Sequence, residues 1–259
     1  MGSPRLLLFH IAAALSFSVA AGEPLEWICG RAGNYTPASP YQDALMHLAR
    51  SLPETTASSS KHFATAKAGA IPDVSIAVAF CRGDADDSAC RVCVAAAFQD
   101  ALQKCPYKKG ASIFHDHCVL KFSDEDFVAS ADGFGDFDTY TSDGNERAPP
   151  EEFDDGGLDA LLQTVVNYTS TSPLRYGTGI RTGSMGTTYA LAQCQPTMAP
   201  QACWGCLMYL LERMPPSFKW KPDGRLRQWR CFIQFDDYPF FTGDPVIHET
   251  TGQLFDEFF

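Results

Sequence analysis

CRGDADDSACRVC (residues 81–93) and CQPTMAPQACWGC (residues 194–206) each contain three cysteines at the same spacing. A fourth cysteine follows each stretch, Cys118 after the first and Cys231 after the second. The position numbers of all four equivalent cysteines differ by the same amount, 113. Four cysteines that match in register without a gap are not expected by chance. The chain is therefore predicted to be a tandem duplication of one module.

Two further cysteines, Cys29 and Cys105, occur only in the first repeat. The constant offset places Ser142 and Phe218 at the equivalent positions of the second repeat. Because an unpaired thiol is a liability in an oxidising compartment, the loss of both together indicates that Cys29 and Cys105 are bonded to each other. Six cysteines allow 15 pairing patterns. Once this pair is fixed, three patterns remain for the other four cysteines of the first repeat.

Among those three we favour one pattern for both repeats: Cys81–Cys90, Cys93–Cys118, Cys194–Cys203 and Cys206–Cys231. Cys90 and Cys93 lie about one helical turn apart, so they are expected to bond outward rather than to each other. Each bridge should contribute roughly 2–4 kcal/mol.

The cysteines also allow a zinc site or a redox site. Zinc ligation would use Cys90, Cys93, Cys105 and Cys118, and redox chemistry would use the pair Cys203 and Cys206. Disulfides are favoured over both because the N-terminus indicates secretion.

Residues 1–22 are typical of a secretory signal peptide. Arg5 precedes an apolar run, Leu6 to Val19, and Ala20-Ala21-Gly22 supply the small residues of a cleavage site. The run is shorter than the ~20 apolar residues that a membrane span needs, and no later segment is long and apolar enough. We therefore expect a secreted, extracellular protein with no membrane span. Removing Arg5 lowers the formal net charge from −11 to −12, which argues against a nucleic-acid partner.

Hydrophobic periodicity predicts the same order of elements in both repeats. In the first repeat, strands are expected at Leu25–Cys29, His62–Lys67 and Val74–Phe80, helices at Tyr41–Leu52 and from Ser88 through Leu102, and a strand-rich stretch at Ser112–Phe122. In the second, strand-like runs cover 181–182 and 187–192, a helix holding Cys203 through Leu211 stops at Pro215, and a strand-rich stretch covers 225–235. This order predicts an α+β fold with helices on one face of an antiparallel sheet.

One helix face is kept between the repeats: Leu45, Leu48 and Leu52 in the first correspond to Leu158, Leu161 and Val165 in the second. We expect domains over residues 23–133 and 134–242, with a C-terminal tail over 243–259.

With Cys-Pro-Tyr-Lys-Lys-Gly at residues 105–110, the doubled cysteine spacing resembles the plant ginkbilobin-like (stress-antifungal) domain. Two such domains behind a signal peptide resemble plant cysteine-rich repeat secretory proteins, over roughly residues 25–240. The resemblance implies two helices on a five-stranded antiparallel sheet in each domain, the bridge pattern given above, and location in the apoplast. It also implies a defence protein without enzymatic activity.

The founding ginkgo member of this family binds mannose, so the resemblance also implies a sugar site. That site consists of an Asn after the first cysteine, an Arg six residues before the last cysteine and an acid five residues after it. In the first repeat, Gly30, Ser112 and Ser123 stand at these positions, and all three depart from the pattern. We expect no sugar binding there.

In the second repeat, the positions hold Asp143, Arg225 and Asp236. Sugar hydroxyls both donate and accept hydrogen bonds, which suits a guanidinium beside carboxylates. Arg225 and Asp236 are 11 residues apart, and a straight strand would separate them by about 36 Å. They can share a ligand only if the chain reverses near Arg230, where Gln228 to Phe235 has no Gly, Pro or Asn to signal a turn.

Mannose or mannose-rich glycans, such as those of fungal cell walls, are therefore the expected partners, with antifungal activity as the consequence. The net negative charge argues against membrane lysis. The competing hypothesis is an apoplastic protein-interaction module in stress or receptor signalling, presenting some of the aromatic residues concentrated in the second repeat: Trp204, Trp220, Trp229, Tyr238, Phe240 and Phe241.

Other candidate sites are weaker. The sequence lacks a Gly-x-Ser-x-Gly elbow, and its histidines form no group with a free cysteine, so we expect no catalytic site and no cofactor. His115 and His117 would share one strand face as a metal pair does, and Asp132, Asp136 and Asp138 fit a calcium loop poorly; no metal is expected. Asn34 and Asn167 begin glycosylation sequons.

Overall fold

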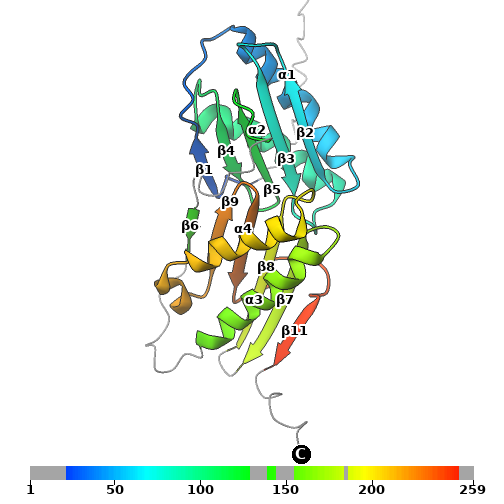
Figure 1. Ribbon diagram of the computed structural model, residues 1–259, viewed down its shortest axis with the longest axis vertical. Coiled ribbons are helices and arrows are strands. Elements are labelled where there is room, and N and C mark those ends of the chain that lie inside the picture. The colour runs from blue at the N-terminus through cyan, green and yellow to red at the C-terminus, as the bar shows by residue number, and fades with distance from the viewer. Residues whose placement is uncertain (1–21, 129–138, 144–154, 184–185, 251–259) are drawn as a thin grey trace, which may run out of the picture.

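The computed structural model describes residues 22–128, 139–143, 155–183 and 186–250 (Figure 1). The first half contains β1 (Glu26–Cys29), α1 (Pro40–Ala57), β2 (Phe63–Ala68), β3 (Ser75–Cys81), α2 (Asp87–Lys104), β4 (Ala111–Phe114) and β5 (Cys118–Ser123). The second half contains β6 (Thr139–Thr141), α3 (Asp155–Thr171), β7 (Tyr176–Gly183), β8 (Gly186–Cys194), α4 (Pro200–Glu212), a short 3₁₀ helix (Pro216–Trp220), β9 (Gly224–Gln228), β10 (Cys231–Asp236) and β11 (Ile247–Thr250). The α+β prediction is confirmed.

Each half places two helices on one face of a sheet. The first sheet has the strand order β1-β4-β5-β3-β2, and the second, read from its other edge, has β6-β9-β10-β8-β7-β11. The constant offset between the repeats maps Glu26, the first residue of β1, onto Thr139, the first of β6, and Cys118 of β5 onto Cys231 of β10. The two halves therefore repeat one topology, as the cysteine spacing indicates.

The expectation of five antiparallel strands in each half is wrong for the second. Its sheet has six strands because β11 adds to β7 in parallel, with Ile247 opposite Gly179. The residues of β11 lie in the segment predicted as a tail, which has no counterpart in the first repeat. Gly179 leaves room for this strand, since a Cβ there would lie 3.2 Å from Ile247 Cβ.

All ten cysteines are paired, in the pattern favoured from the sequence: Cys29–Cys105, Cys81–Cys90, Cys93–Cys118, Cys194–Cys203 and Cys206–Cys231. No cysteine is free. The zinc and redox alternatives are wrong, because every thiol that they require is in a disulfide and Cys203 and Cys206 are bonded to different partners. Within each half, two bridges attach the second helix to two strands of the sheet.

The helix face predicted from periodicity packs against the sheet. Leu45, Leu48 and Leu52 are buried in the core of the first half, and Leu161 and Val165 in that of the second. Leu158, at the start of the same face, packs against the second core while partly exposed.

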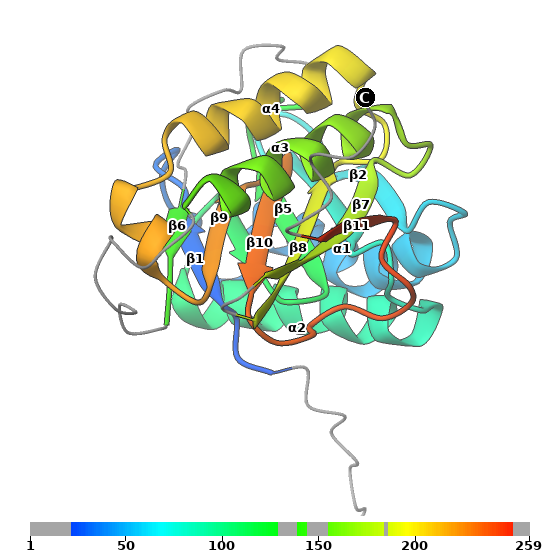
Figure 2. The same cartoon turned by 90° about the horizontal axis from the view of Figure 1, so that it is seen from below.

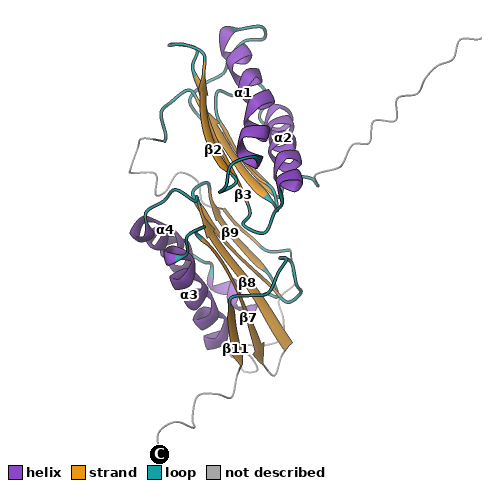
Figure 3. Ribbon diagram, turned by 90° about the vertical axis from the view of Figure 1, so that its right-hand side faces the viewer, coloured by secondary structure: helices purple, strands orange, loops and turns teal. Residues whose placement is uncertain are grey.

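A third cluster joins the halves through the sheet faces that carry no helices. Val78, Phe80, Phe114 and Val119 of the first half meet Leu191, Trp229 and Phe232 of the second. The helices of the two halves consequently lie on opposite outer sides of the molecule, with the sheets between them (Figures 2 and 3).

Polar contacts at this junction fix how the halves meet. The Gln193 side chain accepts a hydrogen bond from the Gly83 amide (3.0 Å) and donates one to the Cys81 carbonyl (2.9 Å). Buried Arg82 pairs with Asp84 at 2.6 Å and also donates to the Phe240 carbonyl. Because a buried ion pair needs all its partners, the segment after β10 is part of the junction.

Candidate functional site

The predicted sugar-site residues of the second half come together because the chain reverses between β9 and β10. Cys231 lies opposite Gln228, and Gln234 lies opposite Arg225. Asp236 is two residues beyond Gln234, so its side chain leaves the sheet on the same face as that of Arg225. This face is the one without helices, since Leu226 and Phe235 belong to the helix-facing core.

The reversal occurs at Trp229 and Arg230 without any of the usual turn residues. Contacts with other segments hold it instead. Trp229 is buried in the cluster between the halves, the Gln195 amide donates to the Arg230 carbonyl at 2.7 Å, and the Arg230 guanidinium donates to the Phe127 carbonyl at 3.2 Å. Tertiary packing therefore replaces local turn chemistry.

A network of charges surrounds Arg225. Its Nη1 lies 2.7 Å from Asp143 Oδ2 and 3.4 Å from Asp223 Oδ2. Asp223 also accepts hydrogen bonds from the Ser142 hydroxyl (3.0 Å) and from the Asp143 amide (2.9 Å). Asp223 thus ties the end of β6 to β9 and orients the other two charges.

Asp223 was not predicted from the sequence. The carried-over pattern names three positions only, and the position equivalent to Asp223 in the first half is Gly110. The available signal was its position two residues before Arg225, just ahead of the stretch predicted as strand-rich.

Asp236 lies deeper, with 1% of the residue exposed. Its Oδ1 accepts a hydrogen bond from the Asp237 amide at 2.8 Å, and its Oδ2 is buried without a hydrogen-bond partner. Burial, followed by repulsion from Asp223, raises the pKa of Asp236 to about 6, although Tyr238 and Arg225 act in the opposite direction. The carboxyl therefore changes charge in the mildly acidic range.

The accessible atoms of this cluster are at its rim. The Asp143 side chain is 82% exposed, whereas that of Arg225 is 12% exposed, and Tyr238 is an exposed aromatic residue. Arg225 keeps its contact with Asp223 when Asp143 moves away, so its charge stays paired. A ligand hydroxyl can therefore displace Asp143 from Arg225 at low cost.

The equivalent place in the first half is an open pocket of about 400 Å³, lined by Gly30, Gly110, Ser112, Lys121 and Ser123 among others. The Gly30 amide donates to the Gly110 carbonyl at 2.7 Å, and a Cβ at Gly30 would lie 2.7 Å from the same oxygen. The close approach of these strands leaves no room for a side chain at position 30. The absence of an Asn at position 30 therefore has a steric basis.

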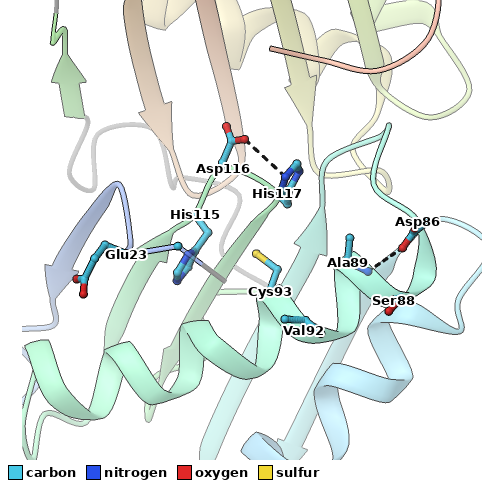
Figure 4. Close-up of a pocket in the computed structure, with 10 residues that line it drawn as sticks. Glu23, Asp86, Ser88, Ala89, Val92, Cys93, His115, Asp116 and His117 are labelled. Carbon is cyan, nitrogen blue, oxygen red and sulfur yellow. Dashed lines mark hydrogen bonds and ion pairs between the residues drawn. The ribbon is translucent and has the colours of Figure 1, made fainter. Parts of the chain in front are cut away.

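His115 and His117, considered above as a metal pair, do not lie side by side on one strand. Both residues lie between β4 and β5, where they line a pocket of about 380 Å³. The His117 ring lies beside Asp116, whereas the His115 ring points away from this pair (Figure 4). Buried His115 Nε2 lies 2.8 Å from Asp100 Oδ2, and burial lowers the pKa of His115 even though Asp100 opposes that shift. Among residues 22–128, 139–143, 155–183 and 186–250, no three potential ligands are arranged to hold a metal ion.

The aromatic residues of the second repeat are divided between two environments. Trp229, Phe240 and Phe241 belong to the cluster between the halves, whereas Trp204 and Tyr238 are exposed. The side chain of Trp220 lies outside the described part. The exposed pair does not form one surface, because Trp204 is on helix α4 and Tyr238 follows β10.

Asn34 and Asn167, the two sequon asparagines, are both exposed. The proposed signal peptide and the calcium loop at Asp132, Asp136 and Asp138 lie outside the described residues, apart from Gly22. Within the described residues, no helix has the length and apolar character needed to cross a bilayer.

Solved structures with the same architecture are known. The structure resembles the tandem DUF26 ectodomain of the Arabidopsis thaliana cysteine-rich receptor-like protein PDLP8, with a TM-score of 0.65 at 19% identity, covering 83% of this chain and 98% of that one. The ectodomain of PDLP5 gives a TM-score of 0.62 at 20% identity, covering 83% of this chain and 99% of that one. At these identities the likeness concerns the fold.

Sequence relatives fall into two groups. Cysteine-rich receptor-like protein kinase 6 of Oryza sativa subsp. japonica is 36% identical over 92% of this chain, and this chain spans 36% of the kinase's length. The antimicrobial ginkbilobin-2-like protein of Castanea crenata is 32% identical, and the match covers 86% of this chain and 91% of that protein. The chain thus spans about a third of the kinase and nearly all of the antimicrobial protein.

A family model described as "Salt stress response/antifungal" matches residues 28–125, which is the first half. The similarity to the Castanea crenata protein extends through both halves. The chain therefore belongs to the salt stress response/antifungal family of ginkbilobin-2-like proteins.

Proposed function

We propose that the protein is an extracellular, non-enzymatic recognition protein of plant defence that binds mannose or mannose-rich glycans through Asp143, Arg225 and Asp236. Residues 23–133 form the first of its two ginkbilobin-like domains, and residues 134–242 together with strand β11 form the second, which carries the site. The observation that carries the proposal is the β9–β10 reversal, which brings Arg225 and Asp236 to one sheet face beside Asp143.

The chemistry of the cluster suits a polyhydroxylated ligand. The guanidinium of Arg225 supplies donors and the exposed carboxylate of Asp143 supplies acceptors, so one sugar can both donate and accept. The carboxylate of Asp236 lies deeper in the same cluster. Asp223 contacts Arg225 while its own side chain is buried, so it leaves the exposed rim of the cluster free for a ligand. We propose that the sugar enters by displacing Asp143 from Arg225, which frees guanidinium N–H groups for its hydroxyls.

Antifungal action follows from recognition of wall glycans in this proposal. The relative from Castanea crenata is named antimicrobial, and the acidic composition of this chain, with 31 Asp and Glu against 20 Lys and Arg, does not suit lysis of anionic membranes. A fungal growth assay with and without free mannose tests this step, since free mannose should relieve the inhibition.

Calorimetric titration with mannose tests the site. Wild type and Ser112→Ala, the matched variant in the first half, should give the same binding heat, whereas Arg225→Ala should lose at least tenfold in affinity. An absence of heat with wild type, or equal affinity for Arg225→Ala, would reject the proposal. In that case a pull-down from apoplastic fluid in excess mannose would test the protein-interaction alternative.

A further inference from the structure

An exposed contact between helices α3 and α4 differs between the halves in an informative way. In the second half, the Trp204 indole Nε1 donates to Asn167 Oδ1 at 3.1 Å. The repeat offset places Glu54 and Arg91 at these positions in the first half, where they form an ion pair. A solvated ion pair has thus been replaced by an amide and an indole.

The aromatic side chain beside Asn167 is partly exposed. Trp204 is 46% exposed, and its equivalent in the first half is Arg91. Here the neighbouring Asn167 begins the sequon Asn167-Tyr168-Thr169.

The orientation of Asn167 suits attachment of a glycan. An indole N–H can only donate, so the atom that faces Trp204 is the amide oxygen. The other amide atom, Nδ2, is the one to which an N-glycan is linked, and it makes no hydrogen bond in the described structure. Because Asn167 is exposed on α3 and its amide oxygen is bonded to Trp204, Nδ2 is held at the surface beside the indole ring.

We propose that Asn167 carries an N-linked glycan whose first sugar packs on Trp204. The apolar C–H face of a pyranose ring covers aromatic surface that would otherwise contact water. The glycan is thereby a structural part of the α3–α4 face, in addition to its solubilising effect. This inference requires passage through the secretory pathway, but it does not depend on sugar binding at Arg225.

The test uses the full chain secreted from plant cells as the Asn34→Gln variant, in which Asn167 is the sole sequon asparagine. Glycopeptide mass spectrometry should find Asn167 occupied. Complete removal with a peptide N-glycosidase leaves a carboxylate at position 167 that still accepts from Trp204, so the hydrogen bond is kept. We expect Tm to fall by about 2–4 °C, and trimming to a single sugar should leave Tm unchanged.

Matched variants separate packing from general effects of a glycan. In a Trp204→Ala variant, deglycosylation should lower Tm by less than half of the decrease seen when Trp204 is present. Glu54→Asn creates a sequon with Thr56 at the equivalent site of the first half, where no indole is present, and removal of that glycan should leave Tm unchanged. An unoccupied Asn167, or an equal loss of Tm in wild type and Trp204→Ala, would overturn the proposal.

Discussion

The same place on the sheet is an open pocket in the first half and a charged cluster in the second. In the first half, Gly30, Gly110, Ser112 and Ser123 leave about 400 Å³ of space. Asp143, Asp223, Arg225 and Asp236 stand at the equivalent positions of the second half. The strands that carry these residues have the same order in both halves. The backbone positions are therefore equivalent in the two halves, and the four side chains at these positions determine which ligand could bind there.

The first half is restricted at this place by its own backbone. Gly30 follows directly after Cys29, whose bridge to Cys105 occurs only in this half. The backbones at Gly30 and Gly110 are in direct contact, whereas Asp143 and Asp223 both carry side chains there. The half with the additional bridge is therefore the half in which position 30 has no room for an acidic side chain.

The largest expected effect tests whether the two halves have equal frameworks. Cys93–Cys118 and Cys206–Cys231 both span a sequence separation of 25 residues. Replacing either pair with alanines should cost about 3–4 kcal/mol, because the closed loops are the same length. Urea unfolding measures both losses. If one double variant lost less than half as much free energy of unfolding as the other, the two disulfide frameworks would not be equivalent.

Gly30→Asp places an acid at position 30 of the first half, as Asp143 does in the second. It should destabilise the protein by about 1–3 kcal/mol, because the new Cβ would overlap the Gly110 backbone. Gly205→Ala on α4 is the control, since a Cβ there meets nothing within 4 Å and helix propensity predicts a gain of about 0.5–1 kcal/mol. Thermal unfolding distinguishes them, and unchanged stability in Gly30→Asp would refute the steric explanation.

A smaller effect concerns the dependence of stability on pH. The pKa of Asp236 is about 6 in the folded protein, above its ordinary value of 3.8, so the folded state binds this proton more tightly than the unfolded state does. Stability from this group is therefore highest below about pH 4 and is lost as pH rises through about 6. Asp236→Asn cannot ionise, so its stability relative to wild type should increase between pH 4 and pH 7.

Urea unfolding at the two pH values measures this difference, and other titrating groups cancel in the comparison of variant with wild type. Ser123→Asn is the matched change in the first half and should show no such dependence. If the difference in free energy of unfolding between Asp236→Asn and wild type is the same at pH 4 and pH 7, the pKa of Asp236 is not raised in the folded protein.

Much of the fold could be predicted because the repeat offset supplies two copies of every local signal. The bridge pattern is one example, since the joint absence of Cys29 and Cys105 equivalents identifies a pair. The strand β11 was not predictable in this way, because it has no counterpart in the first repeat. The turn at Trp229 could not be predicted from the sequence either, because it contains no Gly, Pro or Asn and is held by packing between the halves.

Some residues of the candidate site could be identified from the sequence, and others could not. Arg225, Asp143 and Asp236 could be located by their distance from cysteines, and the structure brings them together. Asp223 is not at a position that the family pattern names, and its role depends on the pairing of β6 with β9. A contact between strands so far apart in the chain is not contained in local sequence.

The most direct test of the difference between the two halves is a mannose titration followed by ¹⁵N–¹H NMR of the labelled protein. We predict saturable shifts of the Asp143, Arg225 and Asp237 amides, with Gly30, Ser112 and Ser123 unchanged. Shifts confined to the first-half residues, or no saturable shift in either half, would contradict sugar binding by the second half.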